Sequence, residues 1–220
     1  DYFLSPNSYT SKIFRRAFRY YGPIIEVGYP RNDILIQNPI QKVNEIKSGL
    51  NIDVDSKVVL YAPTFRDWDL NGYQKAIKDI IKMGSQADEK TIVLLRLHYL
   101  LSKKVSNVNL PENIINVSDY NDVQELLLIS DILVTDYSSI MFDYSLLKRP
   151  IILYCYDYDE YSARRGLYFN LKEKAPGPFC ECIEDVIHFI NDPKLLDDFN
   201  DVLYDFSNNF GELEKGNAAI

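Results

Sequence analysis

Short apolar runs separated by polar turns recur along most of the chain. They are rich in Val, Ile and Leu, which predicts β-strands that are buried on both faces. The predicted strands are residues 57–62, 91–97, 113–117, 132–134 and 151–154. Stretches of helical length lie between most of them. Because strands alternate with helices, the pattern predicts an α/β fold with an open, mostly parallel sheet.

The flanking segments follow helical and turn patterns. Apolar residues share one stripe of a predicted helix at 8–21, and basic residues lie opposite. A strand is expected at 24–27, a turn at 28–33 and a polar loop at 157–178. In the helix at 121–129, Asn121 and Gln124 have the spacing of a capping box. The other expected helices are residues 39–48, 73–83, 183–191 and 194–206.

The stretch 131–156 reads as strand, polar turn, helix and strand. Ser138 or Ser139 is expected to cap a helix that runs to about Lys148. Hydroxyls beside free backbone N–H groups and the positive end of a helix dipole suit an anionic phosphate. Asp143 follows Ser139 by four residues, so its carboxylate would share that helical face. The alternative is that the serines only cap the helix and that Asp143 is solvated.

Polar residues follow several of the predicted strands. Ligands of open parallel sheets bind beyond the carboxyl ends of the strands. The residues expected there are Pro63-Thr64, Arg96-Leu97-His98, Ser118 to Asn121, and Asp136 to Ser139. Their convergence predicts an anion-binding cleft.

Two of these residues carry candidate chemistry. His98 can donate to a phosphate oxygen or relay a proton, and a purely structural histidine is the alternative. Arg96 lies in a strongly apolar strand, so it requires a partner, either a buried carboxylate or a ligand phosphate.

Composition narrows the class of protein. The 220 residues allow one large domain or a medium domain with part of a second, and 46% of them are hydrophobic, enough for a sizeable core. A net charge of −8 argues against a general nucleic-acid binder. The exception is the basic cluster Lys12, Arg15, Arg16 and Arg19, which could meet an anionic membrane or an acidic substrate, although a solvated face is the favoured reading.

Further features concern location and metals. An odd number of cysteines, three, fits a reducing compartment, and no apolar run is long enough to span a membrane. The first residue is not Met, so further sequence is expected at both ends.

The loop residues Arg66 and Arg165 could clamp phosphate, but surface roles are favoured for both. The pairs Asp67/Asp69 and Asp157/Asp159 have the spacing of metal-binding carboxylates, which arises often by chance in an acidic chain.

Five segments resemble the CDP-glycerol glycerophosphotransferase family, the teichoic acid polymerases and primases. They are GYPRND (28–33), YAPTFRD (61–67), LRLH (95–98), SDILVTDYSSIMFDYSLLKRPIILY (130–154) and DYDEYSARRGLY (157–168). They follow the family's order and cover most of the chain. The family's RxHP motif reads Arg96-Leu97-His98-Tyr99 here, so its proline is missing.

The resemblance implies a GT-B glycosyltransferase architecture with two Rossmann-like domains. Residues 1–50 would end the N-terminal domain and form the linker, and residues 51–220 would form the C-terminal, donor-binding domain. CDP-glycerol would be held by Arg31, Pro63, Thr64, Arg96, Leu97, His98, Ser138, Ser139 and Asp143, with Ser118 to Asp122 beside the cytosine. His98 would be the catalytic residue in this chain, and the catalytic base would lie upstream. This chain alone is therefore expected to be inactive.

The implied reaction transfers glycerol phosphate from CDP-glycerol to a hydroxyl of a lipid-linked polyol phosphate or glycan of the cell envelope, with release of CMP. No metal and no cofactor are expected to be needed. The enzyme would lie in the cytoplasm, at the inner face of the cell membrane, as a peripheral protein that binds no nucleic acid. The alternatives are a transferase that uses CDP-ribitol or a nucleotide sugar, and a non-catalytic nucleotide-binding module.

Overall fold

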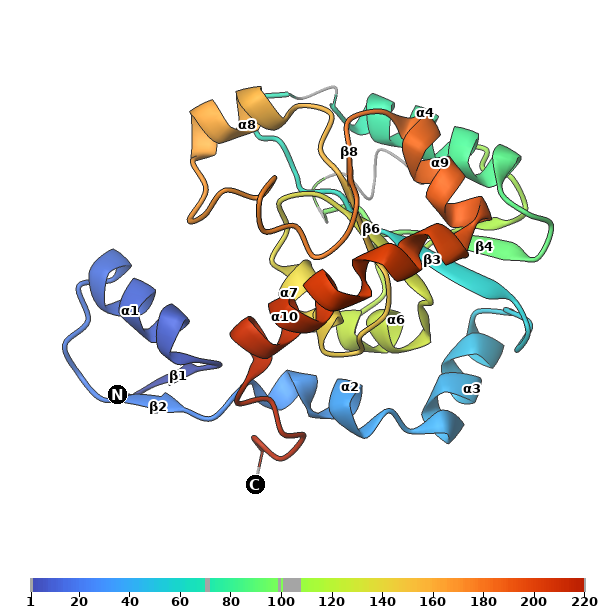
Figure 1. Cartoon of the computed structure of the whole chain (residues 1–220). Coiled ribbons are helices and arrows are strands. Elements are labelled where there is room, and N and C mark those ends of the chain that lie inside the picture. Colours follow the sequence, from blue (N-terminus) through green and yellow to red (C-terminus); the bar gives the residue numbers. More distant parts are fainter. Residues whose placement is uncertain (1, 70–71, 99, 101–107, 220) are drawn as a thin grey trace.

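A six-stranded parallel sheet forms the centre of the molecule (Figure 1). The computed structural model describes residues 2–69, 72–98, 100 and 108–219. The sheet has the order β5-β4-β3-β6-β7-β8. Its strands are β3 (Lys57–Tyr61), β4 (Thr91–Leu95), β5 (Ile114–Asn116), β6 (Ile132–Thr135), β7 (Ile151–Tyr154) and β8 (Phe179–Cys180). Counted from β3, this is the 3-2-1-4-5-6 order of a Rossmann fold.

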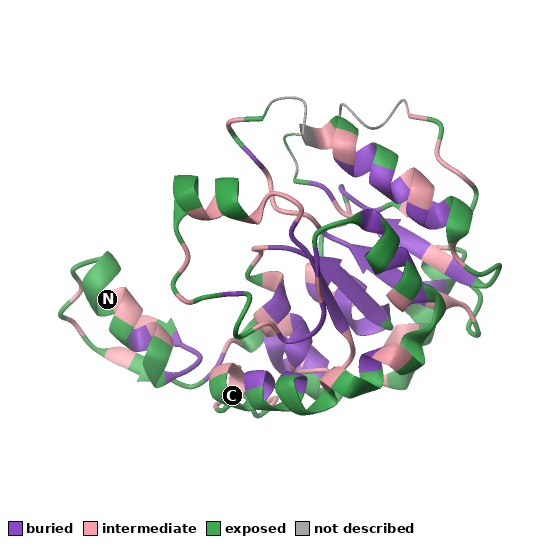
Figure 2. Cartoon of the chain, turned by 45° about the horizontal axis from the view of Figure 1, so that its top comes forward, coloured by how far each residue is buried: buried purple, intermediate pink, exposed green. Residues whose placement is uncertain are grey.

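Helices cover both faces of this sheet, and most strand residues are buried (Figure 2). The side chains alternate along each strand: Val58 and Leu60 join one apolar core, and Val59 and Tyr61 join the other. The helices α4 (Gly72–Gln86) and α9 (Ile183–Asn191) cover one face. The other face carries α3 (Ile40–Gly49), α6 (Val123–Ile129), α7 (Ile140–Ser145) and α10 (Asn200–Gly211). The expected fold class, α/β with the Rossmann-like sheet of a GT-B domain, is confirmed.

A smaller unit precedes the main body. In it, β1 (Phe3–Ser5) and β2 (Ile24–Glu26) pair in parallel, and α1 (Ser8–Ala17) connects them. Asn7 caps α1 by accepting a hydrogen bond from the N–H of Thr10. The helix ends four residues before the expected Tyr21, because Phe18 closes it and Arg19 adopts a left-handed conformation with φ 50°. The linker then passes through a 3-10 turn, Pro30–Asn32, and α2 (Asp33–Gln37).

Several short elements differ from the sequence expectations. The strands β1 and β8 and the helices α2 and α8 (Tyr158–Arg165) were not predicted. The strand β8 has only two residues, and no residue of α8 is buried. Neither element therefore shows a periodic pattern of apolar residues from which it could be predicted. Residues 193–199 form a 3-10 helix where a regular helix was expected. The cap of α6 is Asp122, whose carboxylate accepts from Gln124 N, so the predicted Asn121 capping box is wrong.

The expected domain boundary at residue 50 remains a prediction. Leu35 of α2 and Ile46 of α3 share one apolar core with Val58 of β3. The linker helices are thus packed on the main body, whereas residues 2–27 form the separate β1-α1-β2 unit. In the described residues, no helix is both long and apolar enough to cross a membrane.

Gly177 should be the glycine that tolerates a side chain least. A Cβ there would lie 1.8 Å from the carbonyl oxygen of Ile151 in β7. We expect Gly177→Ala to lower the free energy of unfolding by about 1–3 kcal/mol, or more if β7 shifts. Gly49→Ala in α3 is the matched control, because a Cβ there meets nothing within 4 Å. Urea unfolding of both variants measures the difference, and equal stabilities would contradict the packing described here.

Candidate functional site

The candidate site lies where β3 and β6 run side by side. In a Rossmann sheet the chain crosses to opposite sides at this pair, which leaves a crevice beyond the strands' carboxyl ends. The loop after β3 carries Pro63 and Thr64, and the loop after β6 carries Asp136 to Ser139. Thr135 Oγ1 donates to the carbonyl of Ala62 at 2.8 Å, so the two loops leave the sheet together. The strand order thus leaves a crevice at the carboxyl ends of β3 and β6, which is where the sequence predicted an anion-binding cleft.

Asp136 fixes these two loops to each other. Its carboxylate accepts from the backbone N–H of Thr64 at 2.9 and 3.0 Å and from the Thr64 hydroxyl. It also accepts from the N–H of Tyr137 at 2.7 Å. The side chain is only 2% exposed, so these donors replace the water that a buried carboxylate would otherwise lose. Thr64 and the Ser138-Ser139 turn are thereby held in one arrangement.

Arg66 extends this arrangement to a third loop. Its Nη1 donates to Asp136 at 2.6 Å, and its Nε and Nη2 donate to Asp157, after β7, at 3.0 and 2.9 Å. Arg66 is 6% exposed, so the expected surface role is wrong. Burial alone would lower the pKa of Arg66, but the charge of Asp136 and the hydrogen bonds to Asp157 raise it overall. The guanidinium remains charged and binds three loops together.

Aromatic rings enclose this cation and attach α8 to the sheet edge. The guanidinium carbon of Arg66 lies 5.2, 5.6 and 5.4 Å from the ring centres of Tyr137, Tyr156 and Tyr161. Tyr137 stacks on Tyr161 of α8 at 3.7 Å and donates its hydroxyl to Asp157 at 3.0 Å. Because α8 has no buried residue of its own, these contacts and an exposed ion pair between Arg165 and Asp67 hold it in place.

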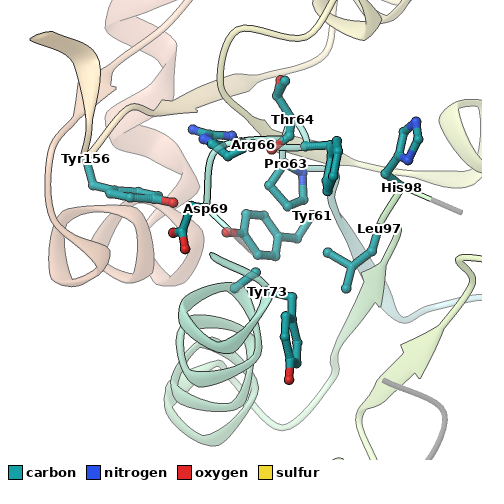
Figure 3. Close-up of a pocket in the computed structure, with 11 residues that line it drawn as sticks. Tyr61, Pro63, Thr64, Arg66, Asp69, Tyr73, Leu97, His98 and Tyr156 are labelled. Carbon is teal, nitrogen blue, oxygen red and sulfur yellow. Dashed lines mark hydrogen bonds between the residues drawn. The ribbon is translucent and has the colours of Figure 1, made fainter. Parts of the chain in front are cut away.

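A small cavity at this edge contains four of the expected donor-binding residues (Figure 3). Pro63 and Thr64 follow β3, and Leu97 and His98 follow β4. The exposed ring of His98 stacks on Phe65 at 5.1 Å, and the N–H of Leu97 donates to Ser118 Oγ at 3.0 Å. Tyr99, where the family's motif has proline, lies outside the described residues.

The apolar strand suggested a buried carboxylate or a ligand phosphate as the partner of Arg96, and no carboxylate is hydrogen-bonded to it in the part of the chain that the structure describes. Its Nη1 donates to the backbone carbonyls of Val117 at 3.3 Å and Tyr120 at 2.8 Å. Burial lowers its pKa. Its observed role is to shape the loop after β5, which the family resemblance places beside the cytosine.

The remaining expected residues line a second cavity, which contains Arg31, Ser139 and Asp143. The sequence suggested that the carboxylate of Asp143 is open to a ligand or to solvent, but in the structure it is occupied by other side chains. It accepts from Arg31 at 3.2 and 3.3 Å, from Asn32 at 3.0 Å and from Gln124 at 3.3 Å. Four donors fill about four lone-pair sites, so Asp143 anchors the linker to α7.

The serine-capped helix is shorter than expected. Its six residues end at Ser145, because the N–H groups of Leu146, Leu147 and Lys148 bond three residues back and Lys148 has a left-handed φ of 54°. Ser139 makes no side-chain cap bond, and Ser138 Oγ accepts only a 3.4 Å contact from Ile140 N. So short a helix has a weak dipole, and any anion at this turn depends on hydroxyls and neighbouring cations.

The acidic pairs considered as metal ligands have other partners. Asp67 pairs with Arg165, and Asp157 pairs with Arg66. Within the described ranges, no three His, Cys, Asp or Glu side chains are grouped so that they could hold a metal ion.

Comparisons with known proteins give the relatives of this chain. The family described as CDP-Glycerol:Poly(glycerophosphate) glycerophosphotransferase matches residues 1–220. A teichoic acid poly(glycerol phosphate) polymerase of Bacillus spizizenii is 40% identical over 100% of this chain and 57% of its own length. A teichoic acid glycerol-phosphate transferase of Staphylococcus aureus is 44% identical over 82% of this chain and 48% of its own length. The chain thus spans about half the length of these curated relatives.

Solved structures agree with this placement. A variant of the wall teichoic acid polymerase TagF, soaked with CDPG, matches with a TM-score of 0.90 at 40% identity over 100% of this chain and 55% of its own. A UDP-GlcNAc 2-epimerase from Neisseria meningitidis matches with a TM-score of 0.59 at 15% identity over 98% of this chain and 58% of its own. The second likeness shows the fold alone.

Removal of the buried Arg66 charge should destabilise the domain strongly. Arg66→Met leaves Asp136 and Asp157 buried without their cation, and the loss of one partner of a buried ion pair costs about 3–5 kcal/mol. Arg165→Met is the matched control, because its pair with Asp67 is about half exposed and should change stability by less than about 1 kcal/mol. Urea denaturation of both variants measures this difference. Similar losses would mean that the Arg66 bridge does not hold the loops.

Proposed function

The chain belongs to the CDP-glycerol:poly(glycerophosphate) glycerophosphotransferase family, and from this we propose that the whole protein transfers glycerol phosphate from CDP-glycerol to a hydroxyl of a teichoic acid polymer. The observation that carries the proposal is the convergence of Pro63, Thr64, Leu97 and His98 in one cavity beyond β3 and β4. This is the part of a Rossmann sheet that holds nucleotides.

In this proposal the donor's diphosphate lies along the edge of the sheet. His98 and Ser138 donate to its oxygens, and Thr64, whose N–H and hydroxyl both donate to Asp136, shapes the loop beside them. Arg96 acts through the loop after β5, whose carbonyls it holds in place for the cytosine. Arg31 and Asp143 act together, because their ion pair joins the linker to α7 at the same turn.

The reaction is phosphoryl transfer. An acceptor oxygen attacks the glycerol-bearing phosphate, a new P–O bond forms, and the bond to the oxygen of CMP breaks. The proton of the acceptor hydroxyl passes to a base outside this chain. Such a transfer depends mainly on positioning and on stabilisation of the charge that develops on the phosphoryl oxygens. Ser138 lies on the loop after β6, which Arg66 fixes through Asp136. His98, on the loop after β4, is the donor proposed to contact the transferred phosphate.

We also propose that α1 contacts the anionic surface of the cell membrane, at its inner face. Lys12, Arg15, Arg16 and Arg19 are all exposed, whereas Glu26 is the only acidic residue among residues 2–27. This local charge opposes the net charge of −8 of the whole chain. Phe18 and Tyr21 are 64% and 86% exposed beside these cations. Basic residues with adjacent aromatic rings suit a peripheral contact with anionic lipid.

The donor assignment predicts a strong effect at His98. In the full-length protein, CMP release from CDP-glycerol should require an acceptor, and His98→Ala should lower kcat by about 10²–10³-fold, as expected for loss of one charge-stabilising donor. The matched control is His188→Ala, the other histidine of the chain, which is exposed on α9. Calorimetry with CDP-glycerol and UDP-glucose checks the nucleotide. Unchanged turnover in His98→Ala would remove His98 from the mechanism, and equal affinity for UDP-glucose would reject the donor.

The membrane proposal predicts that binding depends on α1. A variant of the full-length protein with Lys12, Arg15, Arg16 and Arg19 changed to Gln should bind vesicles of anionic phospholipid at least tenfold more weakly, since each surface cation contributes about 1 kcal/mol. Flotation at low and high salt measures binding, with neutral phosphatidylcholine vesicles as the control. Undiminished binding by this variant would exclude α1 as the contact.

A further inference from the structure

A cavity of about 270 Å³ separates the small N-terminal unit from the main body. Figure 1 shows α1 (blue) to the left of α7 and α10, and residues of all three helices line the cavity. Thr10 of α1 lies on one side, and Phe142 of α7 and Phe210 of α10 lie on the other. Tyr29 and Arg31 reach it from the linker. The cavity is distinct from the one that contains Thr64 and His98, and Ser139 lies on its side of the turn after β6.

The carboxyl ends of two parallel sheets meet at this cavity. The strand β1 ends at Ser5, and Pro6 and Asn7 after it line the cavity. The strand β6 ends at Thr135, and Ser139 after it lines the opposite side. Since ligands bind beyond the carboxyl ends of parallel strands, the place is suited to a ligand held between the two units.

The lining presents many hydrogen-bonding groups that the protein itself does not use. The hydroxyls of Tyr9, Thr10, Tyr29, Ser139 and Tyr168 make no hydrogen bond to any other part of the chain that the structure describes. In the same ranges, Arg31 uses Nε and Nη2 on Asp143, and its Nη1 donates to no protein group. Arg31 is about half exposed and lies 4.2 Å over the ring of Tyr29. One cation and five hydroxyls thus remain for a ligand.

The apolar part of the lining restricts the kind of ligand. Ile13, Phe142, Phe169 and Phe210 form its floor, and Phe142 and Phe210 pack edge to face at 4.9 Å. A ligand that suits these walls has an anionic group for Arg31, hydroxyl or ether oxygens for the tyrosines, and CH groups for the aromatic faces. A chain of polyol phosphate units has all three.

We propose that this cavity is the acceptor subsite, which holds the terminal polyol phosphate units of the growing polymer while the nucleotide donor binds at the edge of the sheet where Thr64 and His98 lie. The inference rests on the proposed function, because a transfer reaction needs a place for each of two substrates. Ser139 lines the second cavity, and Asp136, three residues before it, is hydrogen-bonded to Thr64 of the first, so the loop after β6 connects the two places. The polyol phosphate would bind with its phosphate on Arg31 and its oxygens on Thr10, Tyr29 and Tyr168.

The test removes hydroxyls that have no structural role. The full-length triple variant Thr10→Val, Tyr29→Phe, Tyr168→Phe loses no hydrogen bond between its side chains and the rest of the described protein, so it should fold normally. We expect the KM for a soluble tri(glycerol phosphate) acceptor to rise about tenfold or more, as the loss of three hydrogen bonds implies. The Kd for CDP-glycerol should stay within about twofold of wild type. The complementary variant His98→Ala, in the first cavity, should weaken CDP-glycerol binding instead.

Direct calorimetry with each ligand separates this inference from the proposed function. Binding of tri(glycerol phosphate) by the wild-type protein, and its loss in the triple variant, would support the subsite. If CDP-glycerol then failed to bind the wild-type protein, only the donor assignment would be rejected. An unchanged acceptor KM in the triple variant overturns the inference. A CDP-glycerol affinity that falls as much as the acceptor affinity also overturns it, because the cavity would then belong to the donor.

Discussion

The buried bridge of Arg66 with Asp136 and Asp157 is the interaction on which the site depends. The three side chains come from the loops after β3, β6 and β7. Loops at a sheet edge are ordinarily more mobile than the strands that they follow. A cation enclosed by two carboxylates and by the rings of Tyr137, Tyr156 and Tyr161 supplies the rigidity that the hydrophobic core cannot supply at the sheet edge. This satisfies the requirement of phosphoryl transfer for donors placed before the reaction begins.

A second polar network links the linker to the same turn. Asn32 donates to both Asp143 and Glu214, and Glu214 also accepts from the N–H of Tyr29. Burial is the main reason that the pKa of Glu214 is raised. The network ties the linker, α7 and the C-terminal segment together where the N-terminal unit joins the main body. The position of α1 relative to the Ser138-Ser139 turn therefore depends on a few buried polar groups.

The residues expected to bind the donor lie in two separate cavities, which suggests a different role for each group. Thr64 and His98 lie together beyond β3 and β4, where we propose that the nucleotide binds. Arg31, Ser139 and Asp143 line the cavity between the two units, where we propose that the acceptor binds. Family resemblance alone assigned all of them to one ligand. The geometry separates these residues into two groups, which is why we propose a different substrate for each.

The sequence alone determined the α/β class, the five longer strands and the family, because buried parallel strands are continuous apolar runs and because the motifs are local strings. It also placed Thr64, His98 and the two serines near one edge, since carboxyl ends of parallel strands gather there. Only the tertiary structure decided what each charge contacts. Arg66 was expected at the surface and is buried. Arg96 donates to backbone carbonyls. The carboxylate of Asp143 accepts hydrogen bonds from Arg31, Asn32 and Gln124. Those partners lie tens of residues away along the chain, and no local pattern encodes which distant loop will fold against a given charge.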